Sequence, residues 1–364
     1  MNKITVSAPG KLMLFGEHAV VYGEPCLVTA VDSRLQVTIE PSDKQGISIE
    51  TPQSKDTRFV EAAIQVFNVR MLNLSSPTVI GDPAKNLLDS RWSLSRAPTR
   101  GGNDHELSGI KVTTHSPFSG KFGFGSSSAV TVATLKVLSE FFNRPLSNKE
   151  LFDLSFQVIS QVQGVGSGFD VAAASFGGTL YFKKAGTMIE PLPISWEGIE
   201  LIVGYSGVKS NTVELVKRVA KLREHNERDF DSLMHAIGGI VTQAKEALLK
   251  KDWLQLGKLM NVNQDYLRKL GISTKILEKP IQAAMRAGAL GAKLSGAGGG
   301  DCMIALVDLA HKAAVEHAIT QAGGTIIPVS IHAPGVCEET LQGQVVTGKR
   351  EVNYSLLFPS ASSL

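Results

Sequence analysis

Apolar residues in the first half of the chain form short runs typical of strands, separated by segments with the spacing of amphipathic helices. Residues Asn73–Ser108 interrupt this pattern, because they are rich in Ser, Asp, Asn, Arg, Gly and Pro, and we expect a long surface loop there. Strands are predicted at Ile4–Val6, Leu12–Phe15, Pro25–Ala30, Leu35–Glu40, Ile110–Thr114 and Thr179–Phe182, and helices at Thr57–Phe67, Ala129–Phe142, Asn148–Gln163 and Asp170–Phe176.

The pattern restarts near Ile199 and is typical of a split α+β sandwich. Strands are predicted at Leu201–Tyr205 and Thr325–Ile331 with a hairpin over Ala292–Val307, and helices at Thr212–His225, Asp229–Lys250, Trp253–Lys269, Pro280–Ala287 and His311–Ala322. We therefore predict a first domain over 1–190, a second over 191–334, and a polar, partly disordered tail over 335–364.

Length and composition fit this two-domain interpretation. The chain has 364 residues, of which 43% are hydrophobic and 20% charged, so it can bury large cores. The net charge is only +3 and the basic residues are scattered, which argues against a dedicated nucleic-acid binder.

The cysteines and the apolar stretches indicate where the protein works. Cys26, Cys302 and Cys337 are odd in number and far apart, which fits neither a disulfide framework nor a metal site, and a reducing cytoplasm is the simplest setting. The apolar N-terminal stretch is broken by Pro9, Gly10 and Lys11, and no stretch approaches the length of a membrane span. We therefore expect no membrane association.

A glycine-rich turn between a predicted strand and a predicted helix carries the first candidate chemistry. Ser116–Ser128 reads SPFSGKFGFGSSS and runs into an apolar helix. Glycines let backbone N–H groups converge on a polyphosphate, and a helix N-terminus favours negative charge. The segment is neither a Walker loop nor a clean GxGxxG fingerprint, so an ordinary turn with serine capping is the alternative.

Two further segments give this turn a family context. Together with SAPGKLMLFGEHAVVYG near the N-terminus and KLSGAGGGDC at Lys293–Cys302, the turn resembles the motifs of the GHMP kinases in their usual order. The resemblance covers Val6 to about Ile331. It implies a two-domain α+β fold, with an N-terminal domain like the second domain of ribosomal protein S5 and a ferredoxin-like C-terminal domain. ATP and a small-molecule acceptor would meet between them, and a homodimer is compatible with the family.

The resemblance assigns the catalytic pair. Asp170, in GVGSGFDVAAA, corresponds to the aspartate that orients the acceptor hydroxyl and receives its proton, although such a residue could simply cap the following helix. Lys11 corresponds to a lysine beside that aspartate, where its ammonium would keep Asp170 ionised and stabilise a developing alkoxide.

The nucleotide ligands follow from the same motifs. Ser127 corresponds to the magnesium-binding serine, and the helix before Asp170 departs from the mevalonate kinase pattern because it carries Gln157, Gln161 and Gln163 where a metal-binding glutamate is expected. The expected cofactors are ATP and Mg²⁺. The resemblance implies that the nucleotide contacts Lys121, Gly123, Gly125, Ser126, Ser127, Ser128, Gly296, Ala297, Gly298 and Gly299.

Four residues are expected near the acceptor. Glu17 and His18 would offer hydrogen bonds to it. A buried core histidine is the alternative for His18, because Ala19–Tyr22 resembles a buried strand. Lys209 and Thr212 lie at a strand-to-helix turn and would also reach the acceptor. The alternative is that they are an ordinary helix cap and a surface lysine.

The identity of the acceptor rests on conflicting details. GEHAVVYG and the Met260–Gly300 segment resemble the mevalonate kinases, which implies phosphorylation of the 5-hydroxyl of mevalonate. Lys121, the GSGFDVAAA stretch and Asp301 resemble the phosphomevalonate kinases, and Lys121, Lys209 and Arg218 could then neutralise a second phosphate. We predict mevalonate, with 5-phosphomevalonate as the close alternative and a non-catalytic metabolite sensor as a distant one.

Overall fold

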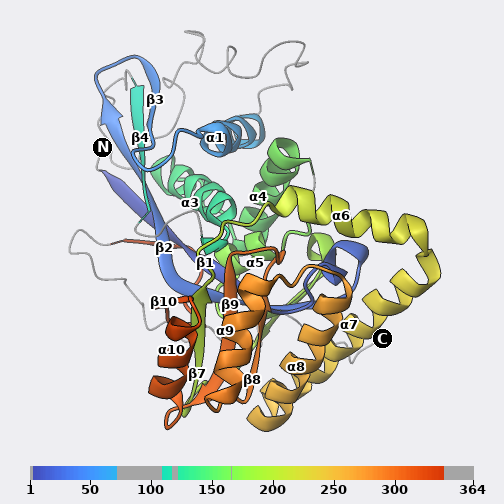
Figure 1. The fold of residues 1–364 in the computed structure, drawn as a ribbon. Coiled ribbons are helices and arrows are strands. Elements are labelled where there is room, and N and C mark those ends of the chain that lie inside the picture. The colour runs from blue at the N-terminus through green and yellow to red at the C-terminus, as the bar shows by residue number, and fades with distance from the viewer. Residues whose placement is uncertain (1–2, 72–108, 117–121, 165, 340–364) are drawn as a thin grey trace, which may run out of the picture.

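The computed structural model describes residues 3–71, 109–116, 122–164 and 166–339, which form two α+β units packed against each other (Figure 1). The predicted two-domain α+β architecture is confirmed. The loop predicted at Asn73–Ser108 lies outside the described residues, as does the tail from residue 340 onward. Among the described helices, none is long and apolar enough to cross a membrane.

The first unit is built on a seven-stranded sheet with the order β11-β1-β2-β4-β3, in which β5 pairs with β2 and β6 with β5. Only β3 and β4 are parallel. The strands are β1 Ile4–Phe15, β2 Cys26–Ser42, β3 Gly46–Glu50, β4 Gly109–His115, β5 Thr179–Lys183, β6 Met188–Leu192 and β11 Cys337–Glu338.

Four helices cover one face of this sheet (Figure 1). They are α1 Arg58–Met71, α3 Ser126–Phe141, α4 Asn148–Gln163 and α5 Phe169–Phe176. Helix α3 is buried along most of its length and packs on β1 and β2, which explains its almost uninterrupted apolar sequence. Helix α4 starts at a capping box formed by Ser147 and Glu150 and ends at Gly164, whose φ is 76°.

The second unit has an antiparallel sheet with the order β10-β7-β9-β8. Its strands are β7 Ile199–Tyr205, β8 Gly291–Ser295, β9 Cys302–Asp308 and β10 Thr325–Ile327, and its helices are α6 Thr212–His225, α7 Glu227–Leu249, α8 Trp253–Lys269, α9 Lys275–Arg286 and α10 Lys312–Gln321. Strand β9 is buried almost throughout, as expected for a central strand. Its partner β8 leads into the glycine-rich segment that faces the first unit.

The structure differs from the prediction in three regions of the first domain. The two strands expected around Pro9 and Gly10 form one strand, because a register shift at this pair accommodates the proline within the ladder. The strands expected before and after Asp32 likewise form the single strand β2. Ala19–Tyr22, interpreted as a buried strand, is a 3₁₀-helix bounded by His18 and Gly23, which both have positive φ.

The end of the second domain also differs. The strand expected over Thr325–Ile331 stops at Ile327, and the chain then returns to the first unit, where Ala333 exchanges backbone hydrogen bonds with Ala30 and Gly178. Residues 335–339 were expected to begin the tail, but β11 pairs with Val6 and Ser7 of β1. The first sheet is therefore completed by residues that follow the second domain.

Candidate active site

Asp170 and Lys11 approach each other around a glycine. A Cβ atom built on Gly125 would lie 3.3 Å from Cε of Lys11 and 3.5 Å from Cβ of Asp170. Lys11 comes from the middle of β1 and Asp170 from the first turn of α5, while Gly125, with φ of 77°, precedes α3. The predicted pair is thus brought together by three elements far apart in the sequence.

The ammonium of Lys11 is held in a buried environment. Its Nζ donates a hydrogen bond of 2.9 Å to the carbonyl oxygen of Gly123 and lies 5.3 Å from the centroid of the Phe169 ring. Burial lowers the pKa of Lys11, and the carboxylates of Asp170 and then Asp301 oppose this shift. A nearby carboxylate therefore favours the charged form that the proposed chemistry needs.

The N-terminus of α3 is suited to an anion. Gly125 occupies the N-cap position and no side chain accepts a hydrogen bond there, so the serine capping given as the alternative is not observed. Ser126 and Ser127 are half-buried in the first turn, while Ser128 is completely buried and its Oγ has no hydrogen-bond partner. Gly125, which precedes this turn, lies beside the Lys11–Asp170 pair. Lys121 lies outside the described residues.

Ser127 has a glutamine neighbour. Nε2 of Gln163, at the end of α4, donates a hydrogen bond of 3.3 Å to Oγ of Ser127. The described residues hold no cluster of three His, Cys, Asp or Glu side chains able to bind a metal ion. A hydroxyl and an amide are neutral oxygen donors, which suit Mg²⁺ that is also bound by phosphate oxygens.

Part of the glycine-rich segment between β8 and β9 is hydrogen-bonded within the protein. The amide of Gly299 donates to the carbonyl oxygen of Ile272 at 2.8 Å. The carbonyl of Gly298 accepts from Ser210 Oγ at 2.7 Å. In this structure the N–H group of Gly299 is therefore already bound, and contacts of this segment with a nucleotide stay a prediction.

Glu17 has a different partner from the one predicted. Its carboxylate forms an ion pair with the ammonium of Lys293, and both side chains are 0% exposed. Burial raises the pKa of Glu17 and lowers that of Lys293, while each charge opposes the shift of the other. In this structure the pair joins the two units, and a contact of Glu17 with the acceptor stays a prediction.

His18 joins the units in a similar way. Nε2 of this buried histidine donates a hydrogen bond of 2.9 Å to the carbonyl oxygen of Ala297, and burial lowers its pKa. Nearby, Oγ of Ser295 donates to the carbonyl of Met13 at 2.9 Å. The alternative of a hydrogen-bonded buried histidine fits this structure, and a contact of His18 with the acceptor stays a prediction.

Lys209 lies at the edge of the site. Its Nζ is 3.9 Å from Oδ1 of Asp301, whereas Thr212 is exposed at the start of α6, with Asn211 as the N-cap. Sequence reasoning missed Asp301 and Lys293 as site residues. The signal for Asp301 was a charged residue directly after GAGGG, and the signal for Lys293 was a lysine within an otherwise apolar strand.

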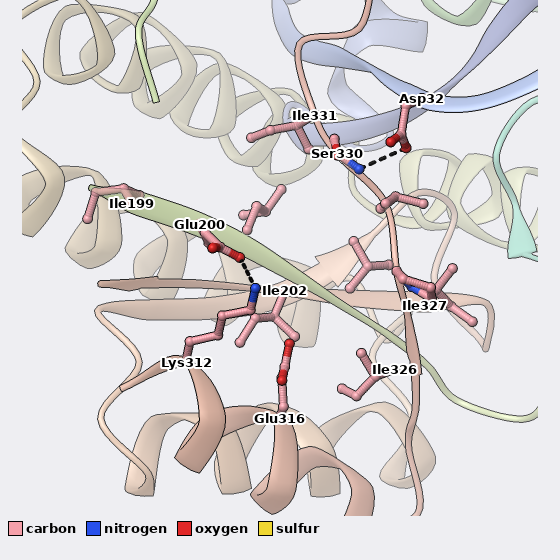
Figure 2. A pocket seen from close by; sticks show the side chains of 14 residues that line it. Asp32, Ile199, Glu200, Ile202, Lys312, Glu316, Ile326, Ile327, Ser330 and Ile331 are labelled. Atoms are coloured by element: carbon pink, nitrogen blue, oxygen red, sulfur yellow. Dashed lines mark hydrogen bonds and ion pairs between the residues drawn. The ribbon is translucent and has the colours of Figure 1, made fainter. Parts of the chain in front are cut away.

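A cavity of about 560 Å³ lies elsewhere, between β7, α10 and the 326–331 segment (Figure 2). Nζ of Lys312 lies 2.6 Å from Oε2 of Glu200 there, and Oδ1 of Asp32 accepts a hydrogen bond from the amide of Ser330. None of the predicted site residues lines this cavity. The Lys11–Asp170 pair lies instead where β1, α3 and α5 pack together.

Two family descriptions match the chain. Residues 92–178 match the GHMP kinases N terminal domain, and residues 244–325 match the GHMP kinases C terminal family. The first match contains Asp170 and the start of α3, and the second contains Gly296 to Asp301.

Individual proteins match over nearly the whole length. The mevalonate kinase of Thermococcus gammatolerans is 37% identical over 92% of this chain and 98% of its own. The crystal structure of L. major mevalonate kinase in complex with R-mevalonate has a TM-score of 0.69 at 26% identity, over 92% of this chain and 96% of its own. A Streptococcus pneumoniae phosphomevalonate kinase complex shares the fold, with a TM-score of 0.70 at 19% identity over 91% of this chain and all of its own.

Proposed function

Since this chain belongs to the GHMP kinases and, among them, to the mevalonate kinases, we propose that it transfers the γ-phosphate of ATP to the 5-hydroxyl of mevalonate. The observation that carries the proposal is the approach of Lys11 and Asp170 around Gly125, directly in front of the uncapped N-terminus of α3. Charge and donors for a phosphate thus lie beside a carboxylate that can serve the acceptor.

Each group has a distinct task in this reaction. The first-turn N–H groups of α3 bind the polyphosphate, and the carboxylate of Asp170 accepts a hydrogen bond from the acceptor hydroxyl. Asp170 takes the hydroxyl proton as the new bond forms between the acceptor oxygen and the γ-phosphorus, while the bond from this phosphorus to the bridging β–γ oxygen breaks and ADP leaves. The Lys11 ammonium stabilises the charge that develops on the acceptor oxygen. Lys11 also donates a hydrogen bond to the Gly123 carbonyl. Its position is therefore coupled to that of the glycine-rich turn before α3, which we call the phosphate loop.

Mg²⁺ is the proposed companion of ATP. Ser127 would hold it, with the amide oxygen of Gln163 within reach of the same place, and the bound ion would neutralise charge on the β- and γ-phosphates. The proposal does not require a protein carboxylate at the ion, because phosphate oxygens and water complete its coordination.

Phosphomevalonate remains the competing acceptor. Lys209 and Arg218 are the described cations that could neutralise its phosphate, and Arg218 lies exposed on α6 beside Gly271.

A non-catalytic sensor is the competing class of function. Retention of both Lys11 and Asp170 in mutual contact with Gly125 favours catalysis. The homodimer and the cytoplasmic location stay predictions.

The test is ADP release by the purified protein with Mg-ATP and either mevalonate or 5-phosphomevalonate at matched concentrations. We expect a higher kcat/KM for mevalonate, and phosphorylation at its 5-oxygen by ³¹P NMR. A higher kcat/KM for 5-phosphomevalonate would identify this compound, and not mevalonate, as the acceptor. Failure to release ADP above background with both would support the sensor.

A further inference from the structure

Arg34 of β2 binds two segments that are far apart in the sequence. Its half-buried guanidinium donates through Nε and Nη2 to Oγ and to the carbonyl oxygen of Ser7 on β1, at 2.6 and 2.9 Å. Nη1 donates to the carbonyl oxygen of Pro334 at 2.7 Å, and Nη2 to that of Gly335 at 2.8 Å. Nη2 also lies 3.0 Å from Sγ of Cys337. One planar fork therefore holds the chain that follows the second domain against β1.

The position of Arg34 in the sheet is close to Lys11. Arg34 lies opposite Pro9, and the register between β1 and β2 shifts between Pro9 and Gly10, so that Lys11 lies opposite Ala30. Such a shift interrupts the regular ladder of hydrogen bonds. The contacts of Arg34 with β1 therefore support the strand at the irregular step that leads to Lys11.

The chain that follows the second domain also covers the C-terminal end of α5. We call residues 328–339 the return segment, since they run from the second unit back to the first sheet. The amide of Val336 donates at 2.9 Å to the carbonyl oxygen of Ala174, which is among the last four carbonyls of α5 and has no partner within the helix. Gly335 lies so close to the helix end that an added Cβ atom would be 2.5 Å from the carbonyl oxygen of Ser175.

Asp170 lies at the other end of the same helix. Helix α5 has eight residues, and Asp170 is in its first turn. Alanines 172–174 form much of its buried surface, and short side chains make few of the contacts that would lock a helix along its axis. The polar contacts at the C-terminal end therefore contribute to the axial position of α5.

We propose that Arg34 is a positioning residue for the transfer reaction. By holding the return segment against β1, it fixes α5, and with it the carboxylate of Asp170, relative to Lys11. Arg34 acts through the backbone and not on the reacting groups. The inference rests on the proposed function for the reaction that is measured, whereas the contacts of Arg34 do not depend on it.

Arg34→Gln tests this role, because glutamine is shorter and has no fork that can bind β1 and the return segment together. We expect kcat with mevalonate to fall by about tenfold, since small displacements of catalytic groups are costly. The KM for ATP should stay within about twofold, because the N-terminus of α3 is not part of this link. A purely structural role would lower the stability and leave the kcat of the folded protein unchanged.

Gly335→Ala tests the same link from the side of the helix. Gly335 does not have a positive φ, so alanine brings a steric contact with α5 and no left-handed strain. We expect a similar loss of kcat with an unchanged KM for ATP. If both substitutions break one link, the double variant should lose little more than either single variant. A loss of roughly hundredfold, the product of two independent effects, would overturn the shared link.

Arg268→Gln is the matched control. Arg268 binds Glu278 through two nitrogens in the second unit, so its loss removes a comparable set of hydrogen bonds away from α5. Its kcat should equal that of the wild type. All rates are compared at a temperature where circular dichroism shows each variant to be folded. If one of the two test variants does not fold, the other decides.

Amide hydrogen exchange follows α5 without any acceptor. Arg34→Gln should accelerate exchange in peptides covering residues 169–178, and Arg268→Gln should not. An unchanged kcat in folded Arg34→Gln overturns the positioning role, and unchanged exchange in these peptides overturns the route through α5. Absence of mevalonate turnover in the wild type would instead reject the proposed function, so the failures are distinguishable.

Discussion

The ammonium of Lys11 donates a 2.9 Å hydrogen bond to the carbonyl oxygen of Gly123, which ties a residue in the middle of β1 to the phosphate loop. A lysine on a central strand has little freedom to move, so this hydrogen bond holds Gly123 close to the sheet.

Asp170→Asn tests the proposed base. The variant keeps the size and hydrogen-bonding capacity of the side chain but cannot take a proton, so kcat should fall by about 10²-fold or more while ATP binding persists. Steady-state kinetics and nucleotide titration measure the two quantities. Asp153→Asn, which removes an exposed carboxylate paired with Lys149 on α4, is the control and should have normal kcat. A near-normal rate in Asp170→Asn would remove Asp170 from this role.

Gly125→Ala tests the close approach of Lys11 and Asp170. The new methyl group would lie 3.3 Å from Cε of Lys11 and would push the pair apart, so we expect a loss of kcat beyond the backbone effect. Gly164→Ala is the control, since φ is 76° there and nothing lies within 4 Å of the added Cβ. Both variants should lose about 1 kcal/mol of stability. Only Gly125→Ala should lose activity at a temperature where both remain folded, and equal activities would argue against a packed catalytic pair.

Glu17→Gln tests the buried ion pair. It leaves the Lys293 ammonium without a counter-charge, and the free energy of unfolding should fall by about 3–5 kcal/mol. Because burial holds the folded pKa of Lys293 below that of the unfolded chain, the unfolded state binds more protons between those pKa values. The stability of the variant should therefore recover as pH rises through that range.

Urea unfolding from neutral to alkaline pH measures this recovery. The double variant Glu17→Leu with Lys293→Met should regain most of the lost stability, since two apolar side chains replace the pair. If Glu17→Gln lowers the free energy of unfolding by less than about 1 kcal/mol, the value for an exposed ion pair, the Glu17–Lys293 pair does not behave as a buried one.

Because His18 is buried, we expect the folded protein to lose stability in mild acid. Burial lowers its folded pKa below 6.5, so the unfolded state binds more protons as pH falls through this range. Stability contributed by neutral His18 is present above pH 6.5 and is lost below it, with a slope of at most about 1.4 kcal/mol per pH unit. Urea unfolding between pH 5 and 8 should show a smaller slope in His18→Gln than in wild type. The slope should not vanish, because burial also lowers the pKa of His332. His235→Gln, at a side chain that is 86% exposed, should leave the slope unchanged.

Local pattern predicted the helices and strands well wherever one face is buried along a continuous segment. Helices α4, α6 and α8 begin and end where expected, because their caps and apolar periodicity are encoded within the segment itself. Ala19–Tyr22 was misread, because four apolar residues have no periodicity to distinguish a strand from a 3₁₀ turn. The brief strand β11 was missed, because two residues pair only through their partner β1.

The candidate site was predictable as a set of motifs and unpredictable as a set of contacts. Lys11 and Asp170 lie together as the family resemblance implied. Glu17 pairs with Lys293, which lies 276 residues later in the chain. This pairing depends on how the two domains pack together, so no local sequence pattern could predict it. Asp301 shows the same limit, since its partners belong to the loops at Gly123 and Ser210.

The return of β11 to the first sheet has a consequence for synthesis on the ribosome. Strand β1 is made before the other described strands of its sheet, yet its outer edge at Val6 and Ser7 meets its partner only after Cys337 and Glu338 have been made. Arg34 likewise awaits the carbonyl oxygens of Pro334 and Gly335. The N-terminal half of the nascent chain thus carries an incomplete edge throughout translation of the second domain, and the first domain reaches its final structure last.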